Sequence, residues 1–315
     1  MNVAVFDLHC DTAFEMLGRG GQPDKILRTN DLHVDLQRAA ALPAYAQCFA
    51  CFSSTLRNSS AASPQDIFRR EVDKIKQQVS ANSDVITLAS NADQIRKNRE
   101  NRRISAILTA EGSAGINFSP DALPMLRDEG FCAISLCWNE QNPLTGSHIA
   151  GGGLTEQGRA FVKQAQALGL VIDVSHISDE AFWDIMDITV APVIASHSNS
   201  RSVHRHSRNL SDDMFSAICA TGGVAGINLY TAFLGGTSLD AVCNHIFRYL
   251  ELDPDGTHIA IGGDLDGCDS LPAGINGIED YPKLACRLAE RGLPDHVIQN
   301  IFWNNALGVI EHCCT

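Results

Sequence analysis

Short apolar runs alternate with amphipathic stretches along almost the whole chain, and this pattern constrains the fold more than any other feature. Eight runs have the length of buried β-strands, and seven stretches of helical period lie between them. We expect the strands over residues 3–8, 45–52, 104–109, 132–137, 170–174, 192–196, 223–228 and 258–263. We expect the helices over residues 65–80, 120–129, 155–168, 178–187, 211–220, 238–251 and 279–291.

Strands that alternate with helices form βαβ units and a parallel sheet. Eight such units within 315 residues predict a single TIM-like (β/α)8 barrel domain that occupies residues 1–315. A doubly wound sheet is the alternative, but no Gly-x-Gly-x-x-Gly motif follows the first strand.

The charge balance limits the partners of such a barrel. The net charge is −13 and the pI is about 5.2, which argues against a nucleic acid or an anionic membrane surface as a partner. The mean hydropathy of −0.05 is ordinary for a soluble protein. No apolar run approaches the roughly 20 residues of a membrane span, and no signal-peptide pattern is visible at the N-terminus.

The eleven cysteines fit a cytoplasmic protein with reduced thiols, because several of them fall inside expected strands and helices and no export signal is seen. Cys48 and Cys51 have the spacing of a redox motif. They lie in an apolar strand instead of at a helix start, which disfavours a redox role.

The first expected strand stops abruptly at a His-x-Asp pair, His9 and Asp11. Residues i and i+2 of a strand point to the same side, so both side chains can aim at one point. An imidazole and a carboxylate that converge in this way supply half of a metal site. An isolated His-x-Asp pair is more often solvent-exposed, so the rest of the chain must supply further ligands.

Barrel active sites lie at the C-terminal ends of the strands, and further ligand residues follow other expected strands. Glu111 follows the third, His176 the fifth, His197 the sixth and Asp264 the eighth. Together with His9 and Asp11 this makes three histidines and three carboxylates, enough for two zinc-like ions that share one carboxylate. Two metals about 3.5–4 Å apart can hold and activate a bridging hydroxide.

At this point the sequence resembles a known family. Its ordered motifs are similar to those of the membrane (renal-type) dipeptidases, peptidase family M19, within the amidohydrolase-like metal barrels. The resemblance runs from residue 3 to about residue 305 and rests on Asp7-Leu-His-Cys-Asp11, Glu111-Gly112, Asp173-Val-Ser-His176, Ser196-His197-Ser198, Ser207-Arg208-Asn209 and Gly262-Gly-Asp-Leu-Asp-Gly267. The generic amidohydrolase pattern starts with His-x-His and uses a carbamylated Lys as the bridge. A His-x-Asp pair with Glu111 at the bridge position favours the dipeptidase branch.

The resemblance implies a role for each metal ligand. His9 and Asp11 would bind the first zinc, Glu111 and a hydroxide would bridge both ions, and His176 and His197 would bind the second. Glu111 would place one negative charge between two dications and so lower their repulsion.

The resemblance also implies that Asp264 lies beside the first zinc and handles the proton of the bridging water. Arg208 would bind the C-terminal carboxylate of the substrate, for which its planar fork is suited. Arg201 and Arg205 are nearby alternatives for this role. Tyr230 would line the substrate site, and a homodimer is the assembly that the family suggests.

One departure from the family pattern concerns the residue after the fourth expected strand. The family usually has a His there, which polarises the scissile carbonyl or stabilises the oxyanion, whereas this chain has Trp138. A Trp supplies one N–H donor and no positive charge. His148, in the Gly-rich stretch Gly146–Gly153, could substitute for the missing His, or the oxyanion could be held otherwise.

These observations predict a zinc-dependent hydrolase of small dipeptides, including those with a C-terminal D-residue. Two alternatives remain open at this point. One is a related amidohydrolase that cleaves N-acyl amino acids or lactones, and the other is a metal-binding barrel without catalysis.

Overall fold

The computed structural model describes residues 1–18, 23–55 and 62–314. The strands in this part of the chain are β1 (Val5–Cys10), β2 (Tyr45–Phe52), β3 (Ile86–Leu88), β4 (Ile104–Glu111), β5 (Phe131–Ser135), β6 (Val171–Asp173), β7 (Val193–Ile194), β8 (Ala225–Ile227) and β9 (Ile259–Ile261). They pair in parallel in the order β7-β6-β5-β4-β2-β1-β9-β8, and β3 lies off this path beside β4.

A short contact between the two outermost strands closes the sheet. Ala195, directly after β7, forms a parallel bridge with Ala225 of β8. The Ala195 N–H donates to the Val224 carbonyl at 3.0 Å, and the Gly226 N–H donates to the Ala195 carbonyl at 2.8 Å. The predicted barrel of eight parallel strands is therefore confirmed.

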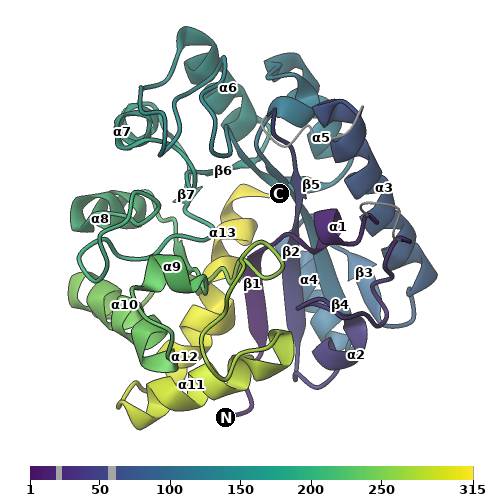
Figure 1. The fold of residues 1–315 in the computed structure, drawn as a ribbon, viewed down its shortest axis with the longest axis vertical. Helices are drawn as coiled ribbons and strands as arrows, with labels where there is room; N and C mark the ends of the chain where they lie inside the picture. The colour runs from purple at the N-terminus through teal and green to yellow at the C-terminus, as the bar shows by residue number, and fades with distance from the viewer. Residues whose placement is uncertain (19–22, 56–61, 315) are drawn as a thin grey trace.

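The helices lie around the strands and, in the case of α13 (Asn305–Cys313), across one end of the barrel (Figure 1). They are α1 (Thr12–Glu15), α2 (Leu36–Ala39), α3 (Pro64–Ala81), α4 (Ala92–Glu100), α5 (Leu123–Asp128), α6 (Glu156–Ala167), α7 (Asp179–Met186), α8 (Asp212–Ala220), α9 (Thr231–Leu234), α10 (Leu239–Leu252), α11 (Tyr281–Glu290), α12 (Asp295–Gln299) and α13 (Asn305–Cys313). Short 3₁₀ segments span Ala114–Ile116, Pro120–Ala122 and Ile278–Asp280, and a π-helical segment spans Asn300–Asn304. Among the described residues, none of the helices has both the length and the apolar character that crossing a bilayer requires.

Helix α3 shows how the local sequence builds one of these helices. The Ser63 side chain accepts from the Asp66 N–H and the Asp66 side chain accepts in return from the Ser63 N–H, so two N–H groups at the helix start are satisfied. Phe68, Val72 and Ile75 then recur at helical spacing and are buried against the barrel.

The structure contains elements that the sequence pattern did not predict, notably β3, α4, α12 and α13. Strand β3 is the segment Ile-Thr-Leu, whose central polar residue interrupts any apolar run. Helix α4 is mostly polar, and only Ala92, Ile95 and Asn98 of its residues are buried.

Two apolar clusters form the core. The larger one lies between the strands and the surrounding helices. The smaller one fills the barrel interior, where Phe6, Leu8 and Ile107 meet Trp303 and Ile310, which come from the π-helical segment and α13. The C-terminal elements therefore close the end of the barrel that lies opposite the carboxyl ends of the strands.

The two cysteines with redox-motif spacing lie on opposite faces of β2. Cys48 belongs to the interior cluster, whereas Cys51 belongs to the outer one. Residues three apart in a strand face opposite sides, so these two thiols cannot form a disulfide without rearrangement of the strand.

Candidate metal centre and active site

A β-bulge at the end of β1 turns the first two ligand residues into the barrel. Phe6 and Leu8 face the interior by simple alternation, which would also turn Cys10 inward. The pairing with β2 instead contains one extra residue in β1, and Cys10 belongs to the outer cluster. This shift of phase brings His9 and Asp11 to the barrel mouth, a re-aiming that bulges commonly provide next to active sites.

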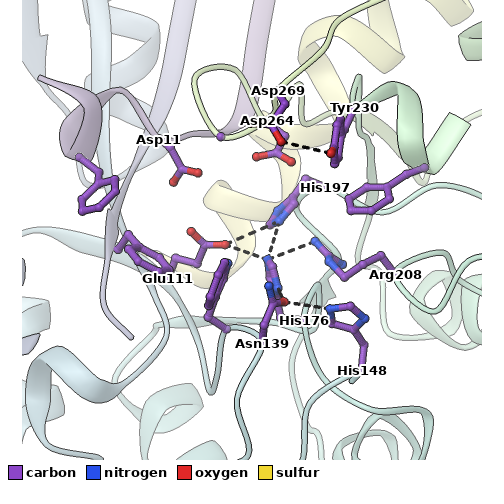
Figure 2. A pocket seen from close by; sticks show the side chains of 15 residues that line it. Asp11, Glu111, Asn139, His148, His176, His197, Arg208, Tyr230, Asp264 and Asp269 are labelled. Carbon is purple, nitrogen blue, oxygen red and sulfur yellow. Dashed lines mark hydrogen bonds and ion pairs between the residues drawn. The ribbon is translucent and has the colours of Figure 1, made fainter. Parts of the chain in front are cut away.

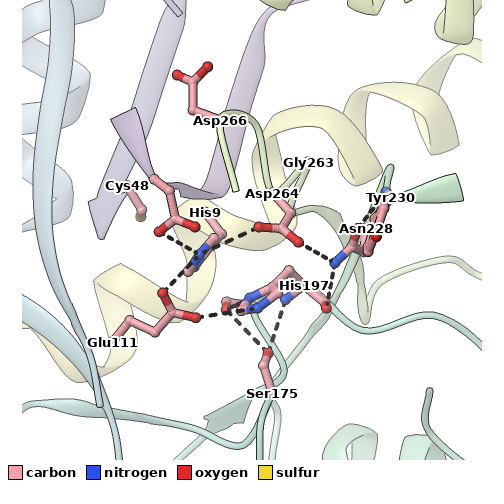
Figure 3. Close-up of polar contacts among 12 residues, drawn as sticks. His9, Cys48, Glu111, Ser175, His197, Asn228, Tyr230, Gly263, Asp264 and Asp266 are labelled. Atoms are coloured by element: carbon pink, nitrogen blue, oxygen red, sulfur yellow. Dashed lines mark hydrogen bonds and ion pairs between the residues drawn. The ribbon is translucent and has the colours of Figure 1, made fainter. Parts of the chain in front are cut away.

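The first group of ligand atoms surrounds the His9 imidazole (Figure 3). His9 Nε2 lies 3.7 Å from Asp11 Oδ1, 3.6 Å from Glu111 Oε2 and 4.0 Å from Asp264 Oδ1. Among the described residues, the first three of these atoms are buried without a hydrogen-bond partner. Buried polar atoms are normally paired, so a cluster of unpaired acceptors fits a bound cation.

The second group of ligand atoms faces the other oxygen of Glu111. Glu111 Oε1 lies 2.8 Å from His176 Nε2 and 3.8 Å from His197 Nε2, and the two Nε2 atoms are 2.9 Å apart. The two carboxylate oxygens of Glu111 thus point to different groups, as a bridging ligand requires. One ligand atom each of His9, Glu111 and His197 also lie within 4.8 Å of one another, so the two groups of ligand atoms are adjacent.

Neighbouring side chains fix how the two histidines of the second group present their lone pairs. His176 Nδ1 lies 3.0 Å from Asn139 Oδ1, and His197 Nδ1 lies 2.7 Å from Ser196 Oγ. An amide oxygen only accepts, so we assign the proton of His176 to Nδ1, which leaves Nε2 free to coordinate. Such partners orient ligating histidines in metal sites.

The electrostatics of the two groups also fit cations. Burial raises the pKa of Glu111 well above its usual range, and the Asp11 charge beside it adds to this shift. Burial alone would lower the pKa of His9, but Glu111 and Asp11 raise it to about 10. Burial lowers the pKa values of His176 and His197, so both are neutral, and the short His176–Glu111 contact is not an ion pair.

Asp264 occupies a strained position after β9. Its φ of 56° lies in the left-handed region, which is uncommon for residues other than Gly. Asn228 Nδ2 donates to its Oδ2 at 2.9 Å, and burial raises the pKa of Asp264 to about 6. A Cβ at Gly267 would lie 2.2 Å from Asp11 Oδ2 and 2.3 Å from Asp264 Oδ1, so Gly is needed there for the loop to approach both carboxylates.

The buried guanidinium of Arg208 lies in the same cavity (Figure 2). It lies 3.2 Å from His176 Nε2 and 3.3 Å from Ser198 Oγ, and no carboxylate of the described residues lies within ion-pair distance. Arg201 by contrast pairs with Asp179, and Arg205 is exposed. Of the three candidate arginines, Arg208 is therefore the one placed to bind a carboxylate in this cavity.

The remaining predicted substrate contacts also line the cavity, whose volume is ≈ 310 Å³. Tyr230 Oη lies 3.5 Å from Asp269 Oδ2. The Trp138 ring packs between Phe52 and His176, with centroid distances of 5.1 and 6.3 Å.

His148 closes another side of the cavity, and both of its ring nitrogens are engaged. Nε2 lies 2.8 Å from Asn139 Oδ1, and Nδ1 lies 2.8 Å from Ser207 Oγ. Burial lowers the pKa of His148 to about 3, with a smaller effect from the Arg208 charge. His148 is therefore neutral at pH 7, and its amide partner Asn139 links it to the ligand His176.

Sequence reasoning missed several side chains that line the cavity, namely Phe14, Phe52, Phe233 and Asp269. Phe52 is the last residue of β2, so its position at a strand end was a usable signal. Phe14 and Phe233 lie on the one-turn helices α1 and α9, and Asp269 lies in a loop, and the sequence pattern predicts the course of none of these segments. Asp266, two residues after Asp264, accepts from the Thr12 hydroxyl and the His33 N–H.

The fold and the site together define a class: parallel (β/α)8 barrels with histidine and carboxylate ligands gathered at the carboxyl ends of the strands. The sequence model of the membrane dipeptidase family, peptidase family M19, matches residues 1–314. The chain therefore belongs to the membrane dipeptidase family, which confirms the resemblance inferred from the motifs.

Individual relatives agree with this assignment. An uncharacterised dipeptidase of Schizosaccharomyces pombe is 30% identical over 248 residues, which cover 76% of this chain and 61% of that protein. An uncharacterised protein from the pqqA 5′ region of Klebsiella pneumoniae is 30% identical over 264 residues, which cover 79% of this chain and 97% of that protein. The chain thus spans less than two thirds of the yeast relative.

A solved structure shows the same fold. The metallo peptidase from Rhodobacter sphaeroides, liganded with a phosphinate mimic of the dipeptide L-Ala-D-Ala, superposes with a TM-score of 0.88 and 22% identity. The match covers 99% of this chain and 100% of that chain. At this identity the likeness establishes the barrel architecture.

Proposed function

We propose that this protein is a dipeptidase that uses two zinc ions to hydrolyse small dipeptides, including those with a C-terminal D-residue. One observation carries the proposal: the two oxygens of Glu111 face two separate ligand groups, and beside them lies the buried Arg208, with no carboxylate of the described residues within ion-pair distance. The dipeptide mimic bound to the Rhodobacter sphaeroides enzyme supports the substrate class and the D-residue.

His9, Asp11 and Glu111 would hold one ion, with Asp264 beside it, and Glu111, His176 and His197 would hold the other. When bound, the pair supplies an activated water at neutral pH and polarises the scissile carbonyl.

The remaining work falls to side chains of the chain itself. Arg208 binds the C-terminal carboxylate of the substrate and so places the peptide bond over the ligand groups. Asp264 Oδ1 faces those groups, so it can accept a proton from the attacking water and return it to the leaving amine. Asn228 holds the other oxygen of Asp264 in place.

The candidate substrates differ in how much stabilisation their oxyanion needs. Trp138 offers one neutral donor, and both nitrogens of His148 already have partners. N-acyl amino acids carry the same carboxylate as dipeptides, so Arg208 would bind them equally. Lactones need less help at the oxyanion, since their leaving group is better, and they remain the alternative that Trp138 favours.

An assay of zinc-reconstituted protein tests the proposal. We expect two zinc ions per chain by elemental analysis, and hydrolysis of L-Ala-L-Ala and L-Ala-D-Ala in preference to N-acetyl-alanine and a lactone. Arg208→Ala should raise KM for free dipeptides by roughly 10–100-fold, because one charged contact is lost, and should change turnover of dipeptide amides little.

Arg205→Ala is the matched control, because Arg205 is exposed and does not line the cavity. It should leave both substrates unaffected. Equal losses on free dipeptides and their amides in the Arg208 variant would refute the carboxylate-binding role. Less than one zinc ion per chain after reconstitution would refute the two-ion site.

A further inference from the structure

Two buried aspartates lie beneath the ligand groups without touching the cavity. We propose that Asp7 and Asp173 are positioning residues, each of which sets the ligands of one of the two ion positions. The inference rests on the proposed two-ion site. It assigns a separate support to each half of that site.

Asp7 ties together the two strand ends that carry the first group. Its Oδ1 accepts from the His9 N–H at 3.0 Å and from the Gly263 N–H at 2.9 Å. The Tyr281 hydroxyl donates to its Oδ2. His9 lies in the bulge of β1, and Gly263 directly precedes Asp264 after β9. One carboxylate therefore holds both the bulge that turns His9 inward and the chain that presents Asp264.

Asp173 does the same for the strand ends that carry the second group. Its Oδ1 accepts from the Ser175 N–H at 3.1 Å and from the Ser196 N–H at 2.9 Å. The Ser196 hydroxyl donates to its Oδ2 at 2.5 Å and lies 2.7 Å from His197 Nδ1. With that hydroxyl committed to Asp173, Ser196 Oγ accepts the His197 Nδ1 proton. Nε2 of His197 is then left as a coordinating lone pair.

The two arrangements share a design. Each aspartate lies two residues before the residue whose N–H it binds, and each also binds an N–H from the neighbouring strand end. A buried carboxylate is costly unless donors surround it, and here each has three. Asp35 is also buried with several donors, but it caps α2 away from the ligands, so it serves as a matched control.

Zinc titration of the metal-free protein by calorimetry tests the assignment. The unmodified protein should show two binding steps. Asp11→Asn identifies the first position by removing one step, and His176→Gln identifies the second.

Asp7→Asn should weaken the step that Asp11→Asn removes by about 10–100-fold, the usual cost of losing a partner of a metal ligand. Asp173→Asn should weaken the His176-dependent step by a similar factor. Each variant should shift the other step less, and Asp35→Asn should shift neither.

Tyr281→Phe gives a milder version of the Asp7 test, because it removes one donor and keeps the carboxylate. It should weaken the Asp11-dependent step by a smaller factor, and it covers the case in which Asp7→Asn fails to fold. Equal shifts of both steps in every aspartate variant, or no shift, would overturn the positioning roles. A single binding step in the unmodified protein would overturn the two-ion proposal instead.

Discussion

The two ends of the barrel are built on opposite principles, although the same strands run between them. At the mouth, where the strands end, His9 Nε2 and Glu111 Oε2 are buried without hydrogen-bond partners, and Asp264 adopts a left-handed backbone. At the floor, where the strands begin, Trp303 packs against Phe6 with centroids 5.9 Å apart in an apolar cluster, and the Arg99 guanidinium lies over the Trp303 ring at its edge.

This difference separates the sources of activity and of stability. Converging carboxylates and a strained backbone destabilise the folded chain until cations and substrate arrive, which is common at functional sites. Apolar burial at the floor offsets this cost by removing large side chains from water. Substitutions at the mouth should therefore change chemistry first, whereas substitutions at the floor should change stability alone.

The largest expected effect is at the mouth. Asp264→Asn should keep both zinc ions and lower kcat by about 10²–10⁴-fold, because an amide cannot accept and return the proton. Steady-state kinetics with parallel elemental analysis measures both quantities.

Asp266→Asn is the matched control, since this carboxylate lies two residues further on and bonds to Thr12 and His33. Its kcat should stay close to that of the unmodified protein. Loss of zinc together with activity in the Asp264 variant would show that Asp264 acts mainly as a ligand.

The next effect is at the floor. Trp303→Ala should lower the free energy of unfolding by about 3–5 kcal/mol, the usual cost of removing a large buried aromatic side chain. Denaturant unfolding measures this loss, and the zinc content and KM of the folded protein should not change. Weakened zinc binding at a temperature where the variant is folded would contradict the separation of the two ends.

Most of the mouth was predictable from sequence, whereas the floor was not. The convergence of the candidate ligands His9, Glu111 and His176 could be predicted because strand ends in a parallel barrel meet, and chemistry-bearing residues there stand out from apolar runs. The floor depends on α13 and the π-helical segment, which follow the last expected strand and helix. The alternation of strands and helices does not predict that a C-terminal segment packs against the beginning of the strands.

The supporting residues of the mouth were also beyond sequence reasoning. Asp7 and Asp173 stand inside apolar runs, where a pattern shows only an isolated polar residue. Their role depends on β9 lying beside β1, on β7 lying beside β6 and on the bulge in β1, all of which are set by three-dimensional packing. The homodimer and the cytoplasmic location stay predictions.

The smallest expected effect is on the stability of the metal-free protein when a carboxylate at the mouth is replaced. In metal-free protein, Glu111→Gln should raise the free energy of unfolding at pH 7 by roughly 0.5–2 kcal/mol, because it removes a carboxyl group whose burial beside Asp11 disfavours its charged form. The pH dependence gives a second measurement. Burial raises the pKa of Asp264 to about 6 and that of Glu111 well above its usual range, so at these two groups the folded chain binds protons that the unfolded chain does not. At these two carboxyls a fall in pH from 7 through 6 toward 4 should therefore favour the folded chain, whereas at the buried neutral His148, His176 and His197 it should disfavour it. The free energy of unfolding of the unmodified protein should thus gain on that of the Gln variant as the pH falls, while its difference from Trp303→Ala should stay constant. Equal slopes in all three proteins would show that the mouth carries no electrostatic cost.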